Sequence, residues 1–300
     1  MRLTLVSLVL VLSSCASPRE VRTTTPLRDW SALAKSGAVP ANESAFELTL
    51  ELSELLGSPD PVLRDDCAFG LSANWIVRQK LLEPDELREL ARRWTANLER
   101  GLGSKADNSV LLRSFSALSL SLIAARDLQT PFLAESEVRG LLEHALDYSA
   151  REQDLRDWDP KLGWIHAVAH TADLLKFLAR NPHIDAAGLN QILDAVEQRL
   201  ATPMERAFSM GEDERLARTL AAVVLRPEHD EQGFEAFLEG LTETRSRARD
   251  AQPFAATNVA IAENISHTLR ALHSLLAAAA DLPPHAQRAR DATLRALARP

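Results

Sequence analysis

The spacing of hydrophobic residues predicts helices over almost the whole chain from residue 44 onward. Leu and Ala recur three and four residues apart, which is the period of one helix face, and the alternation typical of strands is not seen. Acidic residues, Ser or Pro precede the apolar runs, and such residues cap or preorganise a first helical turn. We therefore expect helices to start near residues 58–61, 83–87, 107–109, 134–137, 185 and 211–214.

The predicted helices also repeat in pairs. Similar segments begin near Glu86, Glu137, Ala187 and Phe234, which are 47 to 51 residues apart. A two-helix unit of this length is typical of HEAT and armadillo repeats, which stack into an α-solenoid with a concave face. We therefore predict an all-α fold, built as a HEAT/armadillo-like helical-repeat solenoid. A closed α/α toroid fits the same alternation and is the alternative.

The first residues follow a different pattern. Arg2 precedes an apolar run of about ten residues, which is shorter than the roughly 20 residues that a membrane-spanning helix needs. The run ends at Leu12-Ser13-Ser14-Cys15, which resembles the lipidation motif of bacterial lipoproteins. Ala16, and not Asp, follows the cysteine, and by resemblance to enterobacterial sorting this favours the outer membrane. We expect an envelope protein that is lipid-anchored through Cys15 and faces the periplasm.

These signals divide the chain into three parts. We expect a lipoprotein signal peptide over residues 1–14 and a helical-repeat domain over residues 43–300. Residues 15–42 are rich in Thr, Ser, Pro and Ala, so we expect the lipidated cysteine and a flexible tether there, with one helical turn around Trp30 and Leu33.

Charge and cysteine content narrow the function classes. The formal net charge is −8 and no lysine-rich block occurs, so a nucleic-acid partner is not expected. With Cys15 assigned to lipid, Cys67 is the only other cysteine, and no intramolecular disulfide can form. The sequence also contains no glycine-rich phosphate loop, CxxC pair or dinucleotide fingerprint.

Polar residues gather near the starts of the second helices of the pairs. If successive pairs stack in register, these residues meet along one edge of the concave face and form a ligand groove. Acids in a first turn also have a simpler role, because each stabilises the helix dipole by about 0.3–1 kcal/mol, and Arg113 and Arg215 could pair with them between repeats. The groove candidates are Asp65, Asp66, Asn74, Trp75, Arg113, Ser114, Trp164, His166, His170, Asp173, Glu212, Asp213, Glu214 and Arg215.

Three of these candidates suit a metal. His166, His170 and Asp173 are spaced i, i+4 and i+7, so a helix would place them on one stripe. Two imidazoles and a carboxylate are ligands for zinc or another divalent transition metal. The zinc-protease motif HExxH is not present, because Ala167 follows His166. A hydrogen-bonding role in a ligand groove and a buried structural pair both stay open.

Four segments resemble the bacterial DUF2785 family. They are RDDCAFGLSANWIVRQKLLEPDEL, DNSVLLRSFSALSLSLI, GWIHAVAHTADLL and GEDERLARTL, and the resemblance spans about residues 60–275. It implies a helical fold and supplies no activity, because the family is one of unknown function. The lipidation motif and the Thr/Pro-rich tether are less typical of the family.

Two functional hypotheses follow. In the first, the chain is an anchored scaffold or binding protein whose concave groove binds a protein, a peptide or a small polar ligand. In the alternative, it is a metal-dependent hydrolase in which His166 and His170 bind the ion with Asp173, Asp66 or Glu214, and a spare carboxylate acts as general base. The sequence does not decide whether the chain is an enzyme.

Overall fold

The computed structural model describes residues 28–105 and 107–299. The predicted signal peptide, Cys15 and the first part of the predicted tether lie outside these residues. Within them the regular secondary structure is helical, apart from one short two-stranded hairpin. The predicted all-α fold is confirmed.

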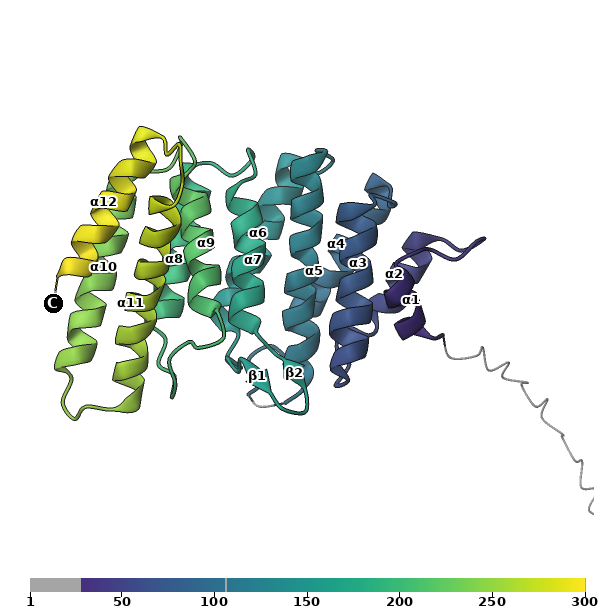
Figure 1. Cartoon of the computed structure of the whole chain (residues 1–300), viewed down its shortest axis with the longest axis horizontal. Coiled ribbons are helices and arrows are strands. Elements are labelled where there is room, and N and C mark those ends of the chain that lie inside the picture. The colour runs from purple at the N-terminus through teal and green to yellow at the C-terminus, as the bar shows by residue number, and fades with distance from the viewer. Residues whose placement is uncertain (1–27, 106, 300) are drawn as a thin grey trace, which may run out of the picture.

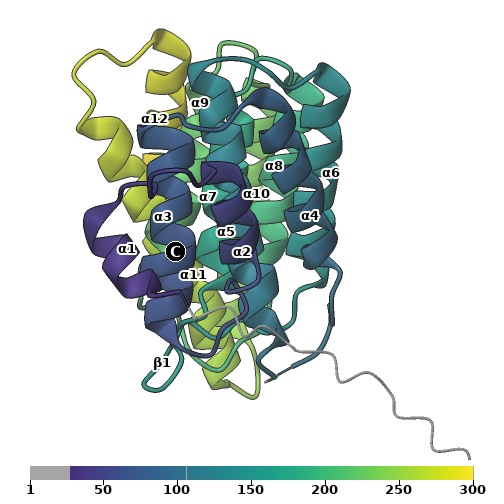
Figure 2. The ribbon, with the colours of Figure 1, turned by 90° about the vertical axis from the view of Figure 1, so that its right-hand side faces the viewer.

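The helices pack in two layers (Figures 1 and 2). In the layer that we call the even layer, each helix packs against the next even-numbered one. This layer contains α2 (Ala45–Ser53), α4 (Pro84–Leu98), α6 (Glu135–Arg151), α8 (Ala186–Leu200), α10 (Glu231–Asp250) and α12 (Pro284–Ala298).

The second layer, called the odd layer, supplies the largest helix contacts of the fold. In it α7 packs between α5 and α9, and α9 packs in turn against α11. A short helix α1 (Trp30–Ser36) packs against the first segment of this layer. The layer contains η1 (Val62–Phe69, π-helical), α3 (Gly70–Ala73), η2 (Asn74–Arg78, π-helical), α5 (Ser109–Gln129), α7 (Ala167–Ala179), α9 (Glu212–Val224) and α11 (Ala256–Ala277).

Helix α5 lies at the centre of the core. It is long and apolar enough to cross a membrane by length and composition, but 83% of its most apolar window is buried by neighbouring parts of the structure. Serines on α5 are buried among the apolar residues, and Ser121 donates a hydrogen bond to the carbonyl oxygen of Leu118 within the helix. This burial is what a core helix of the two-layer body requires.

The array is open in the described residues. Figure 1 shows α1 and α2 at one end of the long axis and α10, α11 and α12 at the other, so the helices do not close into a ring. The alternative prediction of an α/α toroid is therefore wrong. The starts of α5, α7, α9 and α11 lie on the same edge as the hairpin of β1 (Trp158–Asp159) and β2 (Gly163–Trp164). We call this the hairpin edge.

The helix starts lie where the sequence predicts them. In α4, Glu83 and Glu86 form a capping box, in which the Glu83 N–H donates to Glu86 Oε2 at 2.8 Å, and Pro84 occupies the first turn. Asp185 caps α8 by accepting a hydrogen bond from the Gly188 N–H at 3.0 Å. Local capping chemistry is sufficient to position these ends.

Residues 28–42 belong to the folded body and not to a tether. The helical turn predicted around Trp30 and Leu33 is α1, and Gly37 ends it with a left-handed φ of 64°. The Gly37 carbonyl oxygen accepts hydrogen bonds from the side chains of Asn74, Trp75 and Gln79 at 2.9–3.0 Å. This junction ties α1 to η2.

Candidate functional site

The hairpin is closed by a turn that the helical pattern of the surrounding sequence does not predict. Asp159 Oδ1 accepts hydrogen bonds from the N–H groups of Lys161 and Leu162 at 2.8 and 2.9 Å, which closes the turn. Gly163 has a φ of 68°, and a Cβ there would lie 2.9 Å from Pro61, so glycine lets β2 press against the start of η1. The spacing of His166, His170 and Asp173 predicts one helix that contains all three, but α7 begins only at Ala167, after His166.

Arg64 clamps the hairpin to η1. Its buried guanidinium donates to the carbonyl oxygens of Ser58, Leu162 and Trp164 at 2.8, 2.6 and 3.0 Å. It also lies 4.7 Å from the ring centroid of Phe115, in a cation–π contact. Arg64 is not among the predicted site residues. It directly precedes two of them, Asp65 and Asp66, and that position could have identified it.

His166 occupies an unusual backbone position. Its φ of 54° is left-handed, which is uncommon for a residue other than glycine. Its backbone nitrogen lies 3.2 Å from the carbonyl oxygens of both Arg156 and Asp157. These hydrogen bonds join the residue before α7 to the segment that precedes β1. The imidazole is 6% exposed and stacks on the Trp164 indole, with ring centroids 4.6 Å apart and planes 14° apart.

Glu212 faces His166 from the first turn of α9. The His166 Nε2 lies 3.3 Å from Glu212 Oε1, close enough for an ion pair but without an aligned hydrogen bond. Glu212 Oε2 accepts the Met210 N–H at 3.0 Å. Burial opposes ionisation of Glu212, but the contact with His166 and the backbone N–H groups outweigh it and lower the pKa of this carboxyl.

His170 is kept neutral by burial, and Ser114 orients its imidazole. The Ser114 hydroxyl donates to the Ile165 carbonyl oxygen, so its oxygen accepts from His170 Nδ1 at 2.8 Å. Burial, followed by the charges of His166 and Arg215, lowers the pKa of His170 well below 6.5. With the proton on Nδ1, Nε2 carries a lone pair, and it has no hydrogen-bond partner among the described residues.

Asp65, on η1, interacts electrostatically with His166. Burial raises the pKa of Asp65 to about 6, and nearby Asp66 acts in the same direction, while Arg64 and His166 oppose the shift. Asp65 Oδ1 lies 3.0 Å from Arg64 Nε, yet the two atoms are not aligned for a hydrogen bond. His166 therefore interacts electrostatically with two carboxylates, Glu212 at 3.3 Å and Asp65.

This environment predicts a pH-dependent stability effect. The pKa of Asp65 is higher in the folded protein than its ordinary value of 3.8, so its stabilising contribution is complete below that pH and is lost as the pH rises through about 6. We expect Asp65→Asn to raise the free energy of unfolding by about 1–3 kcal/mol near pH ~7.5 and to leave it unchanged below pH ~4. Urea denaturation at both pH values measures this, with Asp213→Asn as a control. Equal effects at both pH values would contradict the expectation.

The predicted metal site does not form. Asp173 Oδ1 accepts from Lys176 Nζ at 2.6 Å, and its Oδ2 pairs with Arg215, so two cations occupy this carboxylate. The rings of His166 and His170 do lie side by side, with centroids 5.6 Å apart. In the described part of the chain, no three His, Cys, Asp or Glu side chains are placed to share a metal ion. The three predicted ligands, His166, His170 and Asp173, therefore do not form a shared metal site in the described part of the chain.

Only some of the candidates meet at this place. We call the group around the His166 imidazole the His166 cluster. It consists of Arg64, Asp65, Ser114, Phe115, Trp164, His166, His170 and Glu212, with the Asp173–Arg215 pair beside His170.

The remaining candidates have other roles. Asn74 and Trp75 bind Gly37, as described above. Arg113 forms a buried ion pair with Glu152, with Nε 2.6 Å from Oε2, so it serves the core and not the groove. Asp66 and Glu214 are exposed, and Glu214 pairs with Arg218 of its own helix at 3.2 Å. Asp213 is half-buried in the first turn of α9.

A cleft adjoins the His166 cluster at the hairpin edge. It has a volume of about 370 Å³ and lies between residues 153–157 and 203–208, with Glu212 in its lining. This volume falls within the range of small-molecule pockets. Glu212 therefore links the cleft to the His166 imidazole.

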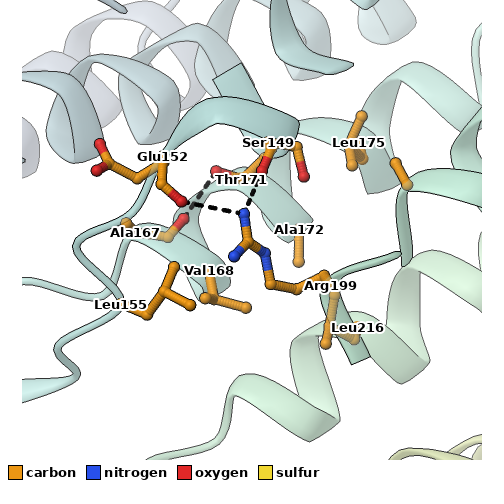
Figure 3. Close-up of a pocket in the computed structure, with 11 residues that line it drawn as sticks. Ser149, Glu152, Leu155, Ala167, Val168, Thr171, Ala172, Leu175, Arg199 and Leu216 are labelled. Atoms are coloured by element: carbon orange, nitrogen blue, oxygen red, sulfur yellow. Dashed lines mark hydrogen bonds between the residues drawn. The ribbon is translucent and has the colours of Figure 1, made fainter. Parts of the chain in front are cut away.

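A second cavity lies inside the fold and is too small for a ligand. Figure 3 shows it between the end of α6, α7 and α8, where Arg199 extends toward the carbonyl oxygens of Ser149 and Glu152. Its volume of about 10 Å³ is close to that of one water molecule.

Comparisons with known proteins bear on the chain as a whole. The model of a family described as a protein of unknown function (DUF2785) matches residues 98–274. No curated protein and no solved structure matches the chain. The matched range contains Ser114, Trp164, His166, His170 and Glu212, while η1, with Arg64 and Asp65, lies before it.

Proposed function

Because the chain belongs to the DUF2785 family, whose description gives no activity, we propose a function from the site itself: the protein binds a small polar ligand at the hairpin edge. The ligand occupies the cleft beside Glu212 and reaches the His166 cluster. A free metabolite and the polar end of a peptide or protein are both ligands of this kind.

One observation carries the proposal. His166 is buried and held in a left-handed backbone conformation, and its Nε2 has no aligned hydrogen-bond partner although Glu212 Oε1 lies 3.3 Å away. Strained backbone and unmet buried polar atoms both cost free energy, and proteins retain them mainly where a ligand or a reaction needs them. The neighbouring cleft supplies the space for such a ligand.

We further propose that the two layers are a HEAT/armadillo-like solenoid. Each of α4, α6, α8 and α10 packs against the odd-layer helix that follows it, and successive pairs stack side by side, which supports this assignment. In such a stack the starts of equivalent helices share one edge, so residues far apart in sequence gather at one place.

The location of the protein is also a proposal. Leu12-Ser13-Ser14-Cys15 supports a lipid anchor at Cys15 in the bacterial envelope, and Ala16 supports the outer membrane, with the body facing the periplasm. The anchor would then hold the hairpin edge within reach of periplasmic ligands. The metal-dependent hydrolase is not carried forward, because its ligand set does not converge.

A ligand panel tests the binding function. We expect one class among amines, sugars, carboxylic acids and phosphate to raise the melting temperature of the wild-type protein, because a ligand at 100 times its Kd adds about 2.7 kcal/mol of stability. The rise should be lost in His166→Asn, since Asn tolerates the left-handed conformation but removes the imidazole. Differential scanning fluorimetry measures both proteins.

His267→Asn is the matched control for the panel. His267 is a half-exposed histidine of α11 that lies 3.3 Å from Glu263 of the same helix, away from the His166 cluster. This variant should respond as the wild type does. A panel in which no class acts, or in which His166→Asn responds fully, would show that the cluster is not a binding site.

A further inference from the structure

The His166 cluster offers hydrogen-bond acceptors that lack donors. His170 is 5% exposed, and its Nε2 carries a lone pair without a partner among the described residues. Asp65 Oδ1 is also buried without an aligned donor. Glu212 adds a buried carboxylate whose oxygen faces His166 at 3.3 Å. A fully buried acceptor such as Asp65 Oδ1 is normally satisfied.

Most donors near these acceptors are already engaged. Arg64 gives Nη1 and Nη2 to three carbonyl oxygens, and Arg215 pairs with Asp173. The Arg64 Nε lies 3.0 Å from Asp65 Oδ1 but is not aligned for a hydrogen bond with it. The Ser114 hydroxyl donates to the Ile165 carbonyl oxygen. A ligand that enters the cluster therefore meets free acceptors and few free donors.

The acidic residues around the His166 cluster also favour a ligand that supplies donors. Asp66 is exposed beside Asp65 and forms no ion pair among the described residues, and Glu212 and Asp213 open α9. Helix starts attract anions, but here the first turns of α9 and η1 already carry acids of their own, whereas those of α5 and α7 carry none. Beside the His166 ring a phosphate or carboxylate would therefore meet like charge. Lys105, Arg156 and Arg206 line the adjoining cleft, where Arg156 pairs with Asp154 and Arg206 lies 3.8 Å from Asp157.

Trp164 adds a partly exposed aromatic face to the His166 cluster. One face of its indole stacks on His166, and the side chain is 39% exposed. An indole face attracts an organic cation, and the attraction is strongest for tryptophan among the aromatic side chains. Trp164 can therefore contact a ligand that lies beside the His166 ring.

We propose that the ligand carries an ammonium or guanidinium group, which binds beside the His166 ring; this rests on the binding function proposed above. Such groups have only donors and no acceptors, so they complement the donor-poor cluster. A sugar hydroxyl brings acceptors as well as donors, and phosphate brings acceptors. The acidic residues, the unpaired acceptors and the exposed indole face therefore all favour an ammonium or guanidinium group.

Arginine amide and citrulline amide test this inference as a matched pair. The two probes have nearly the same shape, but the urea group of citrulline is neutral and contains a carbonyl acceptor. We expect isothermal titration calorimetry with the full mature protein to show at least tenfold tighter binding of arginine amide. Asp65→Asn should weaken that binding at least tenfold, because it removes a charge-assisted hydrogen bond. Asp194→Asn, at an exposed position of α8, should leave it within twofold.

The outcomes separate this inference from the binding function. Equal binding of the two amides, or binding of N-acetylglucosamine or phosphate alone in a His166-dependent manner, would overturn the cation and keep a binding site. No heat from any of the four probes, together with no response in the ligand panel, would overturn both. Thermal melting of Asp65→Asn controls for folding, because that variant is expected to be at least as stable as the wild type.

Discussion

Replacing Arg113 with Met is expected to lower the free energy of unfolding by about 3–5 kcal/mol, because the change leaves the buried carboxylate of Glu152 without its partner. Arg113 Nε and Nη2 lie 2.6 and 3.1 Å from the two oxygens of Glu152, and neither side chain is accessible to solvent. The same guanidinium donates to the Arg100 carbonyl oxygen and to Ser109 Oγ at 2.9 and 2.7 Å. Denaturant unfolding followed by circular dichroism measures the loss.

Two further variants make this expectation specific. Arg113→Met combined with Glu152→Leu should recover much of the stability, since a buried ion pair can often be replaced by apolar residues at little cost. Arg92→Met should change stability by less than about 1 kcal/mol, because Arg92 is 74% exposed and pairs only at the surface with Glu89. A loss of less than about 1 kcal/mol in Arg113→Met alone would contradict this expectation. It would mean that Glu152 gains another partner or is protonated.

Replacing Arg64 with Met is expected to cost about 3 kcal/mol and to loosen the hairpin. The guanidinium is the donor for three carbonyl oxygens, at Ser58, Leu162 and Trp164. An acceptor that loses its partner while buried costs about 1–3 kcal/mol, and relaxation of the hairpin toward water recovers part of this. Denaturant unfolding gives the stability, and hydrogen exchange of residues 158–164 gives the local effect.

The local readout distinguishes a clamp from a general core contribution. We expect protection of the hairpin amides to fall more than that of α5 in Arg64→Met, because only the hairpin loses its tie to η1. Arg218→Met, which removes only the exposed pair with Glu214, is the control and should leave both unchanged. A uniform fall in protection across the body would show that Arg64 does not act as a local clamp.

Much of the fold could be predicted from local patterns. The α4 segment places Leu87, Leu90, Trp94 and Leu98 on one face, and these residues are buried in the core. The acidic and proline-containing starts act within one turn of the chain, so their effect does not depend on distant residues. For the same reason the short helix at Trp30 is visible in the sequence, whereas its docking through Gly37 is not.

The candidate site could be predicted only in part. Trp164, His166, His170, Ser114, Asp65 and Glu212 do gather, as stacking of the predicted pairs in register implies. Helical spacing gave the wrong geometry for His166, because the hairpin interrupts the pattern and the residue adopts a left-handed φ. The turn signal lay in Asp159-Pro160 and Gly163, between two apolar stretches.

The sequence by itself determined the helices, their caps and the position of the polar residues near helix starts, since spacing and capping act over a few residues. The tertiary structure decided which of those residues meet. Asn74 and Arg113 are close in sequence to members of the His166 cluster, yet they bind Gly37 and Glu152 instead. The physical reason is that a buried polar group takes the partner that packing brings to it, and packing joins residues about 50 to 100 positions apart.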